Sequence, residues 1–157
     1  MHPNQQLLID FYGAFNQSDG DTMAASYHDT AQFSDPVFTN LDADGARAMW
    51  RMLTDQATDL RVESSNIVAD ETAGSARWEA WYTFSVTDRK VHNIIDARFE
   101  FQDGKITRHV DSFDFWRWTR HALGLPGILL GWTPLIQNKI RHQAARGLQK
   151  WREKAER

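Results

Sequence analysis

Hydrophobic residues along the chain first follow a helical spacing and later alternate, which predicts helices followed by strands. In residues 4–17 the apolar side chains recur every three or four positions, so we expect a helix with one apolar stripe. A short helix near residues 21–27 follows a polar break. Residues 44–57 predict another amphipathic helix, which Asp42 or Asp44 can cap.

From residue 60 onward the hydrophobic period changes to two, which is typical of strands with one buried face. We predict strands at residues 60–69, 76–86, 91–102 and 105–117, and a shorter one that ends at Pro36. The Asp-Gly pair at 103–104 is a strong hairpin turn. The chain is therefore expected to be α+β, with helices on one face of a curved antiparallel sheet.

The C-terminal part has a different composition. The stretch GLPGILLGWTP is apolar and interrupted by Gly and Pro, and its Thr-Pro pair predicts an N-cap and the first position of a helix. We assign residues 1–118 to the main domain and 119–157 to a helical extension. Because its apolar side chains need cover, we expect the extension to pack on the domain or a partner subunit rather than to anchor in a membrane. These side chains are Leu123, Leu125, Ile128, Leu129, Leu130 and Trp132, and then Ile136, Ile140, Leu148 and Trp151 on the last helix.

Composition narrows the class of protein. The 157 residues suit one domain with a substantial core, and the lack of cysteine excludes disulfides and thiolate metal sites. No apolar run approaches the ~20 residues needed to span a bilayer. The N-terminus lacks a basic region followed by an apolar stretch, so we expect a cytoplasmic protein without a signal peptide.

Charge is distributed unevenly along the chain. Residues 134–157 hold seven Lys/Arg and two Glu, or +5, whereas the rest holds eleven Lys/Arg and nineteen Asp/Glu, or −8. We interpret this as a solvated basic helix that partly neutralises an acidic body. A nucleic-acid-binding protein would need a broader basic face, so we expect no nucleic-acid partner.

The segment RHVDSFDFWRW, residues 108–118, places charged residues among apolar ones on a predicted strand. If Asp103-Gly104 is a two-residue loop, Asp96 faces Asp111 across the hairpin, and His109 shares their face. Alternation places Asp114 on the other face. On a solvent-facing sheet, Arg98 would bridge the two acids; in a pocket, one of the two carboxyl groups would have a raised pKa. A bulge near 96–98 would change this register.

The order of elements, with YHDTAQFSDPVF after two helices and FEFQDGKITRHVDSF late in the strands, resembles the NTF2-like superfamily over roughly residues 4–116. The phrase DGKITRHVD looks like the late strand of its SnoaL-like branch, where a glycine turn precedes an H-x-D strand. The resemblance implies a cone-shaped α+β domain, often dimeric. It supports the fold more than the reaction, because one fold hosts many functions.

Three positions also resemble ketosteroid isomerase, a member of the same superfamily. FSDP supplies Asp35 where that enzyme has its proton-transferring aspartate, and FYGAFN supplies Tyr12 where it has its oxyanion tyrosine. NIIDARF supplies Asp96 where it has a protonated aspartate. The matching last-strand positions are apolar in the isomerase but are His109 and Asp111 here, which favours a substrate smaller or more polar than a steroid.

The resemblance thus implies a small-molecule pocket in which Asp35 abstracts a proton beside a carbonyl while Tyr12 and Asp96 stabilise the enolate. His109 and Asp111 would tune Asp96 or form a second acid–base pair. The alternatives are a cyclase or epoxide hydrolase that uses His109 and Asp111, and a binding domain without chemistry. We predict no cofactor and no metal, and expect a homodimer. The expected pocket walls are Phe33, Trp50, Trp78, Tyr82, Phe84 and Phe113.

Overall fold

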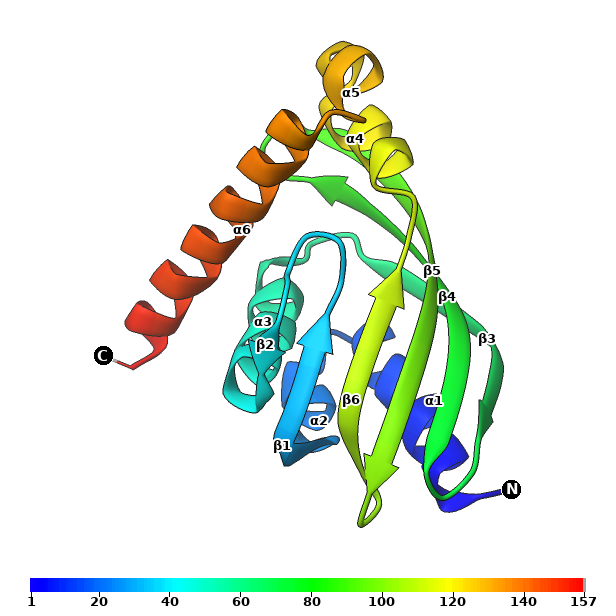
Figure 1. The fold of residues 1–157 in the computed structure, drawn as a ribbon. Helices are drawn as coiled ribbons and strands as arrows, with labels where there is room; N and C mark the ends of the chain where they lie inside the picture. Colours follow the sequence, from blue (N-terminus) through cyan, green and yellow to red (C-terminus); the bar gives the residue numbers. More distant parts are fainter. Residues whose placement is uncertain (157) are drawn as a thin grey trace.

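Six strands form one curved sheet whose concave side holds the N-terminal helices (Figure 1). The computed structural model describes residues 1–156. The strand order is β2-β1-β6-β5-β4-β3; β1 runs parallel to β6 and every other pair is antiparallel. The α+β prediction is confirmed, although the sheet is mixed rather than purely antiparallel. The strands are β1 Tyr27–Ser34, β2 Leu41–Asp42, β3 Arg61–Ala69, β4 Ala73–Phe84, β5 Arg89–Gln102 and β6 Lys105–Ser112.

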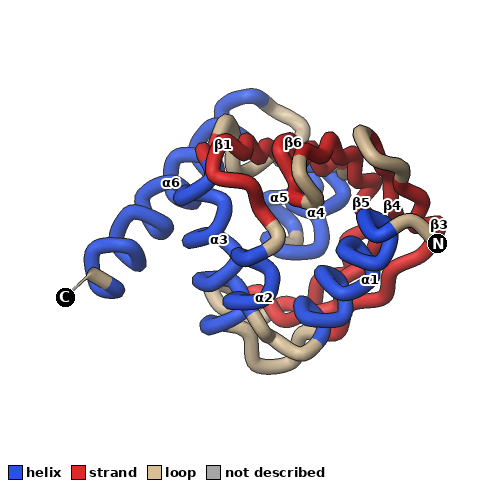
Figure 2. The backbone as a smooth tube through the Cα atoms, turned by 90° about the horizontal axis from the view of Figure 1, so that it is seen from below, coloured by secondary structure: helices blue, strands red, loops and turns tan. Residues whose placement is uncertain are grey.

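Three helices precede β3 and cover the concave face (Figure 2). They are α1 Pro3–Asn16, α2 Gly20–Ala25 and α3 Ala43–Gln56. Asp19 caps α2, and Asp42 caps α3 by accepting from the backbone N–H of Gly45 at 2.8 Å. The apolar stripe of α1 and the inward face of α3 meet in an aromatic core, where the Phe11 and Trp50 rings lie edge to face at 5.6 Å.

The β5–β6 hairpin has the predicted turn but not the predicted register. Asp103 and Gly104 both have positive φ, as a tight two-residue turn requires, and Gln102 pairs with Lys105. A bulge next to Phe101 then shifts every later pair by one residue, so that Asp111 faces Ala97 and Asp96 faces Ser112. A shift of one residue moves a side chain to the opposite face of its sheet. The predicted pairing of Asp96 with Asp111 is therefore wrong.

Strand β6 ends five residues earlier than predicted. It stops at Ser112, because Asp114 leaves the ladder and accepts a hydrogen bond from the backbone N–H of Arg117 at 3.0 Å. Asp114 is thus the N-cap of helix α4, Phe115–Leu123. Residues 113–117 form a loop and a first helical turn, and over so short a stretch their apolar residues imitate the period of two that is typical of a strand.

Helix α6, Pro134–Ala155, crosses the open side of the molecule and packs against α3. Its N-cap is Thr133, as predicted from the Thr-Pro pair. Leu148 is 4% exposed within the main core, and Trp151 donates from Nε1 to the Asp55 carboxylate at 3.4 Å. Arg141 donates from Nε to the carbonyl of Pro36 at 2.8 Å, so α6 also holds the loop that follows β1.

The short helix α5, Leu125–Leu130, lies at the apex between α4 and α6 (Figure 1). Its large side chains face solvent: Leu125 is 65% exposed and Leu129 is 59% exposed. Within the described chain the leucines of α5 do not pack on the cone, because Gly127, rather than a leucine, faces α4; their packing on a partner subunit stays a prediction.

Substitution of Leu148 tests how much α6 stabilises the domain. We expect Leu148→Ala to lower the free energy of unfolding by about 2–4 kcal/mol, because it removes buried methyl groups and leaves a cavity. Leu135→Ala on the same helix is the matched control, since Leu135 is 79% exposed and its loss should change stability by less than about 0.5 kcal/mol. Urea unfolding measures both variants, and equal effects would show that α6 does not contribute to the core.

Candidate active site

A cavity of about 440 Å³ lies between the concave face of the sheet, helix α3 and the underside of α6. Its volume falls in the range of small-molecule sites. Five of the six predicted wall residues line it, and α6 adds Ile140, Gln143, Ala144 and Gly147, which the sequence did not suggest. The sixth, Phe33, does not line the cavity; it is buried behind it, against the ring of His109 at 4.8 Å. The five that line it are Trp50, Trp78, Tyr82, Phe84 and Phe113.

Asp111 brings a carboxylate to the floor of this apolar cavity. It is 3% exposed, and its Oδ1 atom lies 2.8 Å from Nε2 of His109. The indole of Trp78 donates to the same oxygen over 3.5 Å. Because both contacts reach Oδ1, the second oxygen remains available to a molecule in the cavity.

Asp111 is the end of a chain of buried polar groups that runs through the core. Nε1 of Trp50 donates to the hydroxyl of Tyr27 at 2.7 Å, and that hydroxyl lies 2.8 Å from Nδ1 of His109. An indole N–H can only donate, so the tyrosine proton is free to point at Nδ1. His109 then carries its own proton on Nε2 and donates to Asp111. This one arrangement gives every donor in the chain an acceptor.

Aromatic rings enclose His109, which is fully buried. The ring of Phe99 lies 4.3 Å from the imidazole, and Trp50 stacks with it at 6.2 Å. His109 does not line the cavity, so it does not meet a ligand directly. It positions Asp111 by fixing the orientation of its carboxylate.

Two further carboxylates line the cavity: Asp59, which accepts from the backbone N–H and the hydroxyl of Thr83, and Asp35, at the rim. Asp35 follows β1, and its Oδ1 atom accepts from the backbone N–H groups of Val37 at 2.7 Å and Phe38 at 2.6 Å. Burial raises the pKa of Asp35 to about 7 and outweighs every other influence on it. The hydrogen bond from the Phe38 backbone lowers this pKa, the nearby charge of Asp111 raises it, and the hydrogen bond from Val37 lowers it. Near neutral pH Asp35 is therefore protonated in a large fraction of molecules.

Tyr82 supplies a hydroxyl beside Asp35. Its oxygen accepts from Nε1 of Trp118 at 2.7 Å, which leaves the tyrosine proton free to be donated into the cavity. Burial is the main reason that the pKa of Tyr82 is raised to about 12, and the charge of Asp35 adds to it. The hydroxyl thus remains a donor at every physiological pH.

Asn93 is a polar residue of the cavity that the sequence analysis missed. It is 8% exposed, lines the cavity, and lies on the inward face of β5 between Val91 and Ile95. The signal was present: period two places position 93 on the apolar face of its strand. A polar residue in that position indicates either a satisfied core amide or a ligand contact.

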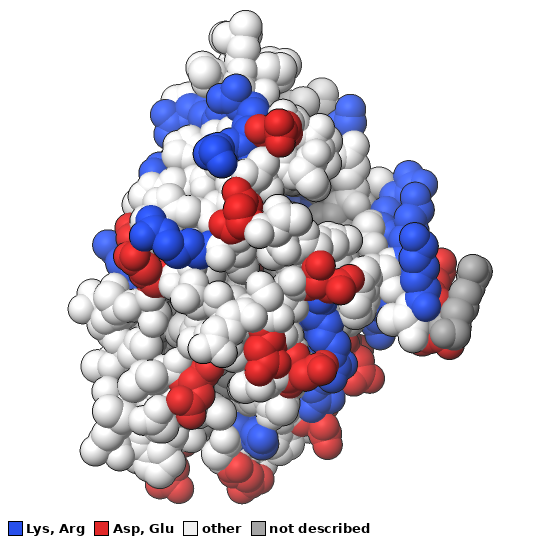
Figure 3. Space-filling model, turned by 180° about the vertical axis from the view of Figure 1, so that it is seen from behind, with Lys and Arg blue, Asp and Glu red and all other residues white. Residues whose placement is uncertain are grey.

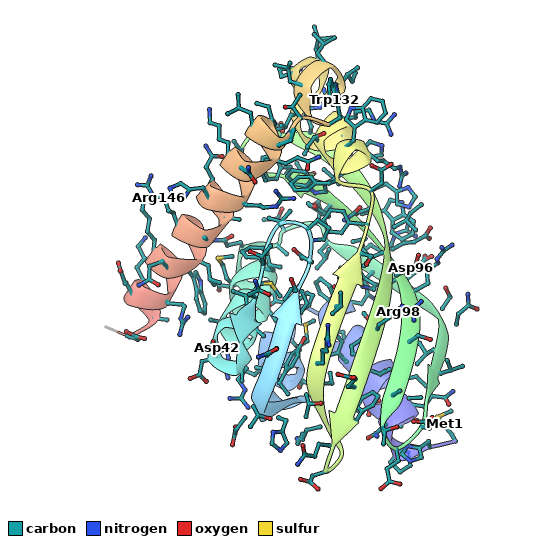
Figure 4. The ribbon with its side chains drawn as sticks, in the orientation of Figure 1. Met1, Asp42, Asp96, Arg98, Trp132 and Arg146 are labelled. Atoms are coloured by element: carbon teal, nitrogen blue, oxygen red, sulfur yellow. The ribbon has the colours of Figure 1, made fainter. Side chains whose placement is uncertain are left out.

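The remaining predicted site residues do not reach the cavity. Asp96 projects from the outer face of β5 near Arg98 and forms an ion pair with Arg77 at 3.0 Å, which lowers its pKa (Figure 4). It is not a protonated pocket acid. Tyr12 is buried, and its hydroxyl has no hydrogen-bond partner among the described residues, but it does not line the cavity. Burial, and secondarily the charge of Asp111, raises the pKa of Tyr12.

A family model with the description SnoaL-like domain matches residues 8–109. The chain belongs to the SnoaL-like family. This confirms the predicted branch of the NTF2-like superfamily. No protein of the curated set matches the chain in sequence.

Solved structures share the fold of this SnoaL-like protein. A LEH-like epoxide hydrolase of M. tuberculosis is 21% identical with a TM-score of 0.64, covering 81% of this chain and 95% of its own. IdmH of Streptomyces antibioticus, a proposed polyketide cyclase, is also 21% identical with a TM-score of 0.64, covering 79% and 100%. A proposed polyketide cyclase of Xanthomonas campestris is 20% identical with a TM-score of 0.63, covering 76% and 96%. At these identities the likeness establishes the fold alone.

Two tyrosine variants test the buried polar chain. Tyr27→Phe leaves the indole of Trp50 without an acceptor and Nδ1 of His109 without a partner, so we expect a loss of about 1–3 kcal/mol in the free energy of unfolding. Tyr12→Phe removes a hydroxyl that has no protein partner and should change stability by less than about 1 kcal/mol. Denaturant unfolding compares the two variants. Equal losses of stability would contradict the series of hydrogen bonds from Trp50 through Tyr27 and His109 to Asp111.

The raised pKa of Asp35 predicts a pH dependence of stability. The folded pKa of about 7 lies above the ordinary value of 3.8, so between these values the folded state binds more protons than the unfolded state. The contribution of Asp35 to the free energy of unfolding therefore decreases as pH rises through this window. The free energy of unfolding of Asp35→Asn should therefore be lowest relative to wild type at low pH, and this deficit should shrink as pH rises to about 7. Parallel stability curves for the two proteins would contradict the assignment.

Proposed function

We propose that this SnoaL-like protein is an acid–base enzyme that moves a proton beside the carbonyl group of a small uncharged molecule. The observation that carries the proposal is the pair of carboxyl groups at one apolar cavity in unequal environments. Asp111 is held by N–H donors as an acceptor, whereas Asp35 has a pKa of about 7. A pair in which one group holds a proton and the other accepts one is the arrangement that acid–base catalysis needs.

In the proposed step, the free oxygen of Asp111 takes a proton from the carbon beside the carbonyl. The C–H electron pair forms the enolate double bond, and the carbonyl electrons move to oxygen. Protonated Asp35 or the hydroxyl of Tyr82 donates to that oxygen, and Asn93 offers a further N–H. Return of a proton to another carbon completes an isomerisation; attack of the enolate on a second carbonyl completes a cyclisation.

These roles differ from the expectation drawn from ketosteroid isomerase. Asp35 was expected to be the base, but its pKa of about 7 suits an acid at neutral pH when Asp111 is the base. Tyr82 takes the donor role expected of Tyr12, because Tyr82 lines the cavity and Tyr12 does not.

The cavity lining also supports a class of ligand. No Lys or Arg occurs among the described residues that line it, so nothing there would neutralise a carboxylate or phosphate. Its aromatic and aliphatic walls favour an apolar skeleton, and Asp35, Tyr82, Asn93 and Asp111 offer polar contacts to a carbonyl group. We therefore propose an uncharged, largely apolar carbonyl compound as substrate.

Epoxide hydrolysis is the second candidate, and the same pair of carboxyl groups favours it. Asp111 would take a proton from water as the water oxygen attacks an epoxide carbon. Protonated Asp35 would give its proton to the epoxide oxygen as the C–O bond breaks. The product would be a diol, and no group besides water would be consumed.

Hydrogen exchange tests the carbonyl proposal. A panel of apolar ketones incubated in D₂O with the protein should exchange the hydrogens beside the carbonyl for deuterium, followed by NMR. Asp111→Asn should lower the exchange rate by at least about 10²-fold, because it removes the base. Asp96→Asn is the matched control and should leave the rate unchanged, since Asp96 lies on the outer face.

The pH profile and an isotope label separate the candidates. With Asp35 as the acid, the rate should fall as pH rises above about 7. Epoxides incubated in H₂¹⁸O should gain the label only if the second candidate holds. Absence of exchange for every ketone, together with labelled diol from an epoxide, would replace the first proposal by the second; absence of both would leave a binding protein.

A further inference from the structure

Helix α5 has its small residues inside and its large apolar residues outside. A side chain at Gly127 would collide with the backbone of Thr119, and one at Gly131 would collide with the Thr119 hydroxyl. The helix therefore packs against α4 through glycine, which lets the two backbones approach closely. The leucines that would normally form the buried stripe are left on the outer side. Those exposed side chains are Leu125, Ile128, Leu129, Leu130, Trp132 and Leu135, at 48–79% exposure.

This apical knob, which we define as residues 125–135, is a fixed structure within the described chain. Two indole N–H groups bind its backbone: Nε1 of Trp116 donates to the carbonyl of Ile128 at 3.2 Å, and Nε1 of Trp132 donates to that of Leu129 at 3.1 Å. The turn into the knob is held as well, because Arg89 donates from Nε to the carbonyl of His121 at 2.9 Å. The knob thus presents its apolar side chains without needing to refold.

Basic residues flank the knob. From Phe115 to Ile140 the sequence contains no Asp or Glu but three Lys/Arg, which are Arg117 and Arg120 on α4 and Lys139 on α6. The turn from β4 to β5 contacts α4 through Thr87 and contains Asp88. Strand β5 then begins with Arg89 and Lys90, of which Lys90 pairs with Asp59 at 3.7 Å. In Figure 3, blue side chains gather just below an uncharged white apex.

We infer that the apical knob docks into the surface of an anionic bilayer, with its leucines and Trp132 among the lipid chains near the headgroups and the flanking Arg and Lys residues at the phosphates. The apolar surface with its tryptophan suits the lipid chains of such a bilayer, and the basic border suits its anionic headgroups. The knob projects from the molecule, with Trp132 at its apex (Figure 4). A projecting shape can enter a fluid layer without a matching groove.

A second copy of the chain fits this surface less well. The common two-fold dimer would place apex against apex, and so bring the same basic border together on both subunits. Like charges brought so close oppose association. Anionic lipid instead supplies the opposite charge. No helix among the described residues is long and apolar enough to cross a bilayer.

Vesicle sedimentation tests the inference with the full chain. We expect binding to vesicles of phosphatidylcholine mixed with phosphatidylglycerol, weaker binding to phosphatidylcholine alone, and a decrease as salt is added. Leu125→Ser combined with Leu129→Ser should lower partitioning at least about tenfold, because two exposed leucines can no longer enter the lipid. Val68→Ser is the control, since Val68 is also exposed, at 58%, but lies on β3.

The outcomes are separable. Both altered proteins should melt as wild type does, because the changed side chains are exposed. Absence of binding to either vesicle, or equal binding by wild type and the double variant, would overturn the inference. If light scattering shows a dimer that the double variant alone loses, the knob is an interface between copies of this chain and the bilayer assignment is wrong.

Discussion

A buried polar chain from Trp50 to Asp111 sets the geometry on which the site depends. Burying a carboxylate in an apolar core costs several kcal/mol unless donors reach it. Here the donors come from elements far apart in sequence: α3 gives Trp50, β1 gives Tyr27, β6 gives His109 and β4 gives Trp78. Each element must therefore lie where its donor reaches the next acceptor, and the concave sheet around α3 is the arrangement that allows it.

The same series of buried hydrogen bonds gives Asp111 different hydrogen-bond donors from those of Asp35. Asp111 receives side-chain donors from the core, whereas Asp35 sits in a loop and receives two backbone N–H groups. Burial is the main reason that the pKa of Asp35 is raised to about 7, and the charge of Asp111 adds to it, so Asp35 holds a proton in a large fraction of molecules at neutral pH. Arg141 of α6 holds the carbonyl of Pro36, next to Asp35, and so the roof of the cavity also positions its acid.

Much of the fold could be predicted from periodicity, turn chemistry and caps, because each depends on neighbouring residues. The Asp103-Gly104 turn and the caps at Asp42 and Thr133 are of this kind. The bulge beside Phe101 could not be predicted, since a one-residue insertion depends on how the whole sheet bends. The extra residue lies on β6 and turns His109 and Asp111 to the buried face of Ala97 and Phe99, whereas Asp96 lies on the exposed face of β5, which separated Asp96 from Asp111 without changing the fold.

The candidate site shows the same division between local and distant information. His109 and Asp111 could be singled out as candidates from the sequence, but their burial depends on the register of β6. The role of Tyr82 could not be predicted, because it depends on a hydrogen bond from Trp118. Trp118 lies on α4, 36 positions away, so the alternation of residues along β4 does not reveal the contact. The C-terminal helices illustrate the limit most clearly. Apolar residues in 123–132 predict burial by composition, yet glycine at 127 decides which side of α5 faces α4, because only a residue without a side chain lets the two backbones approach. The close contact between the backbones of α4 and α5 and the exposure of the α5 leucines therefore both follow from packing through Gly127.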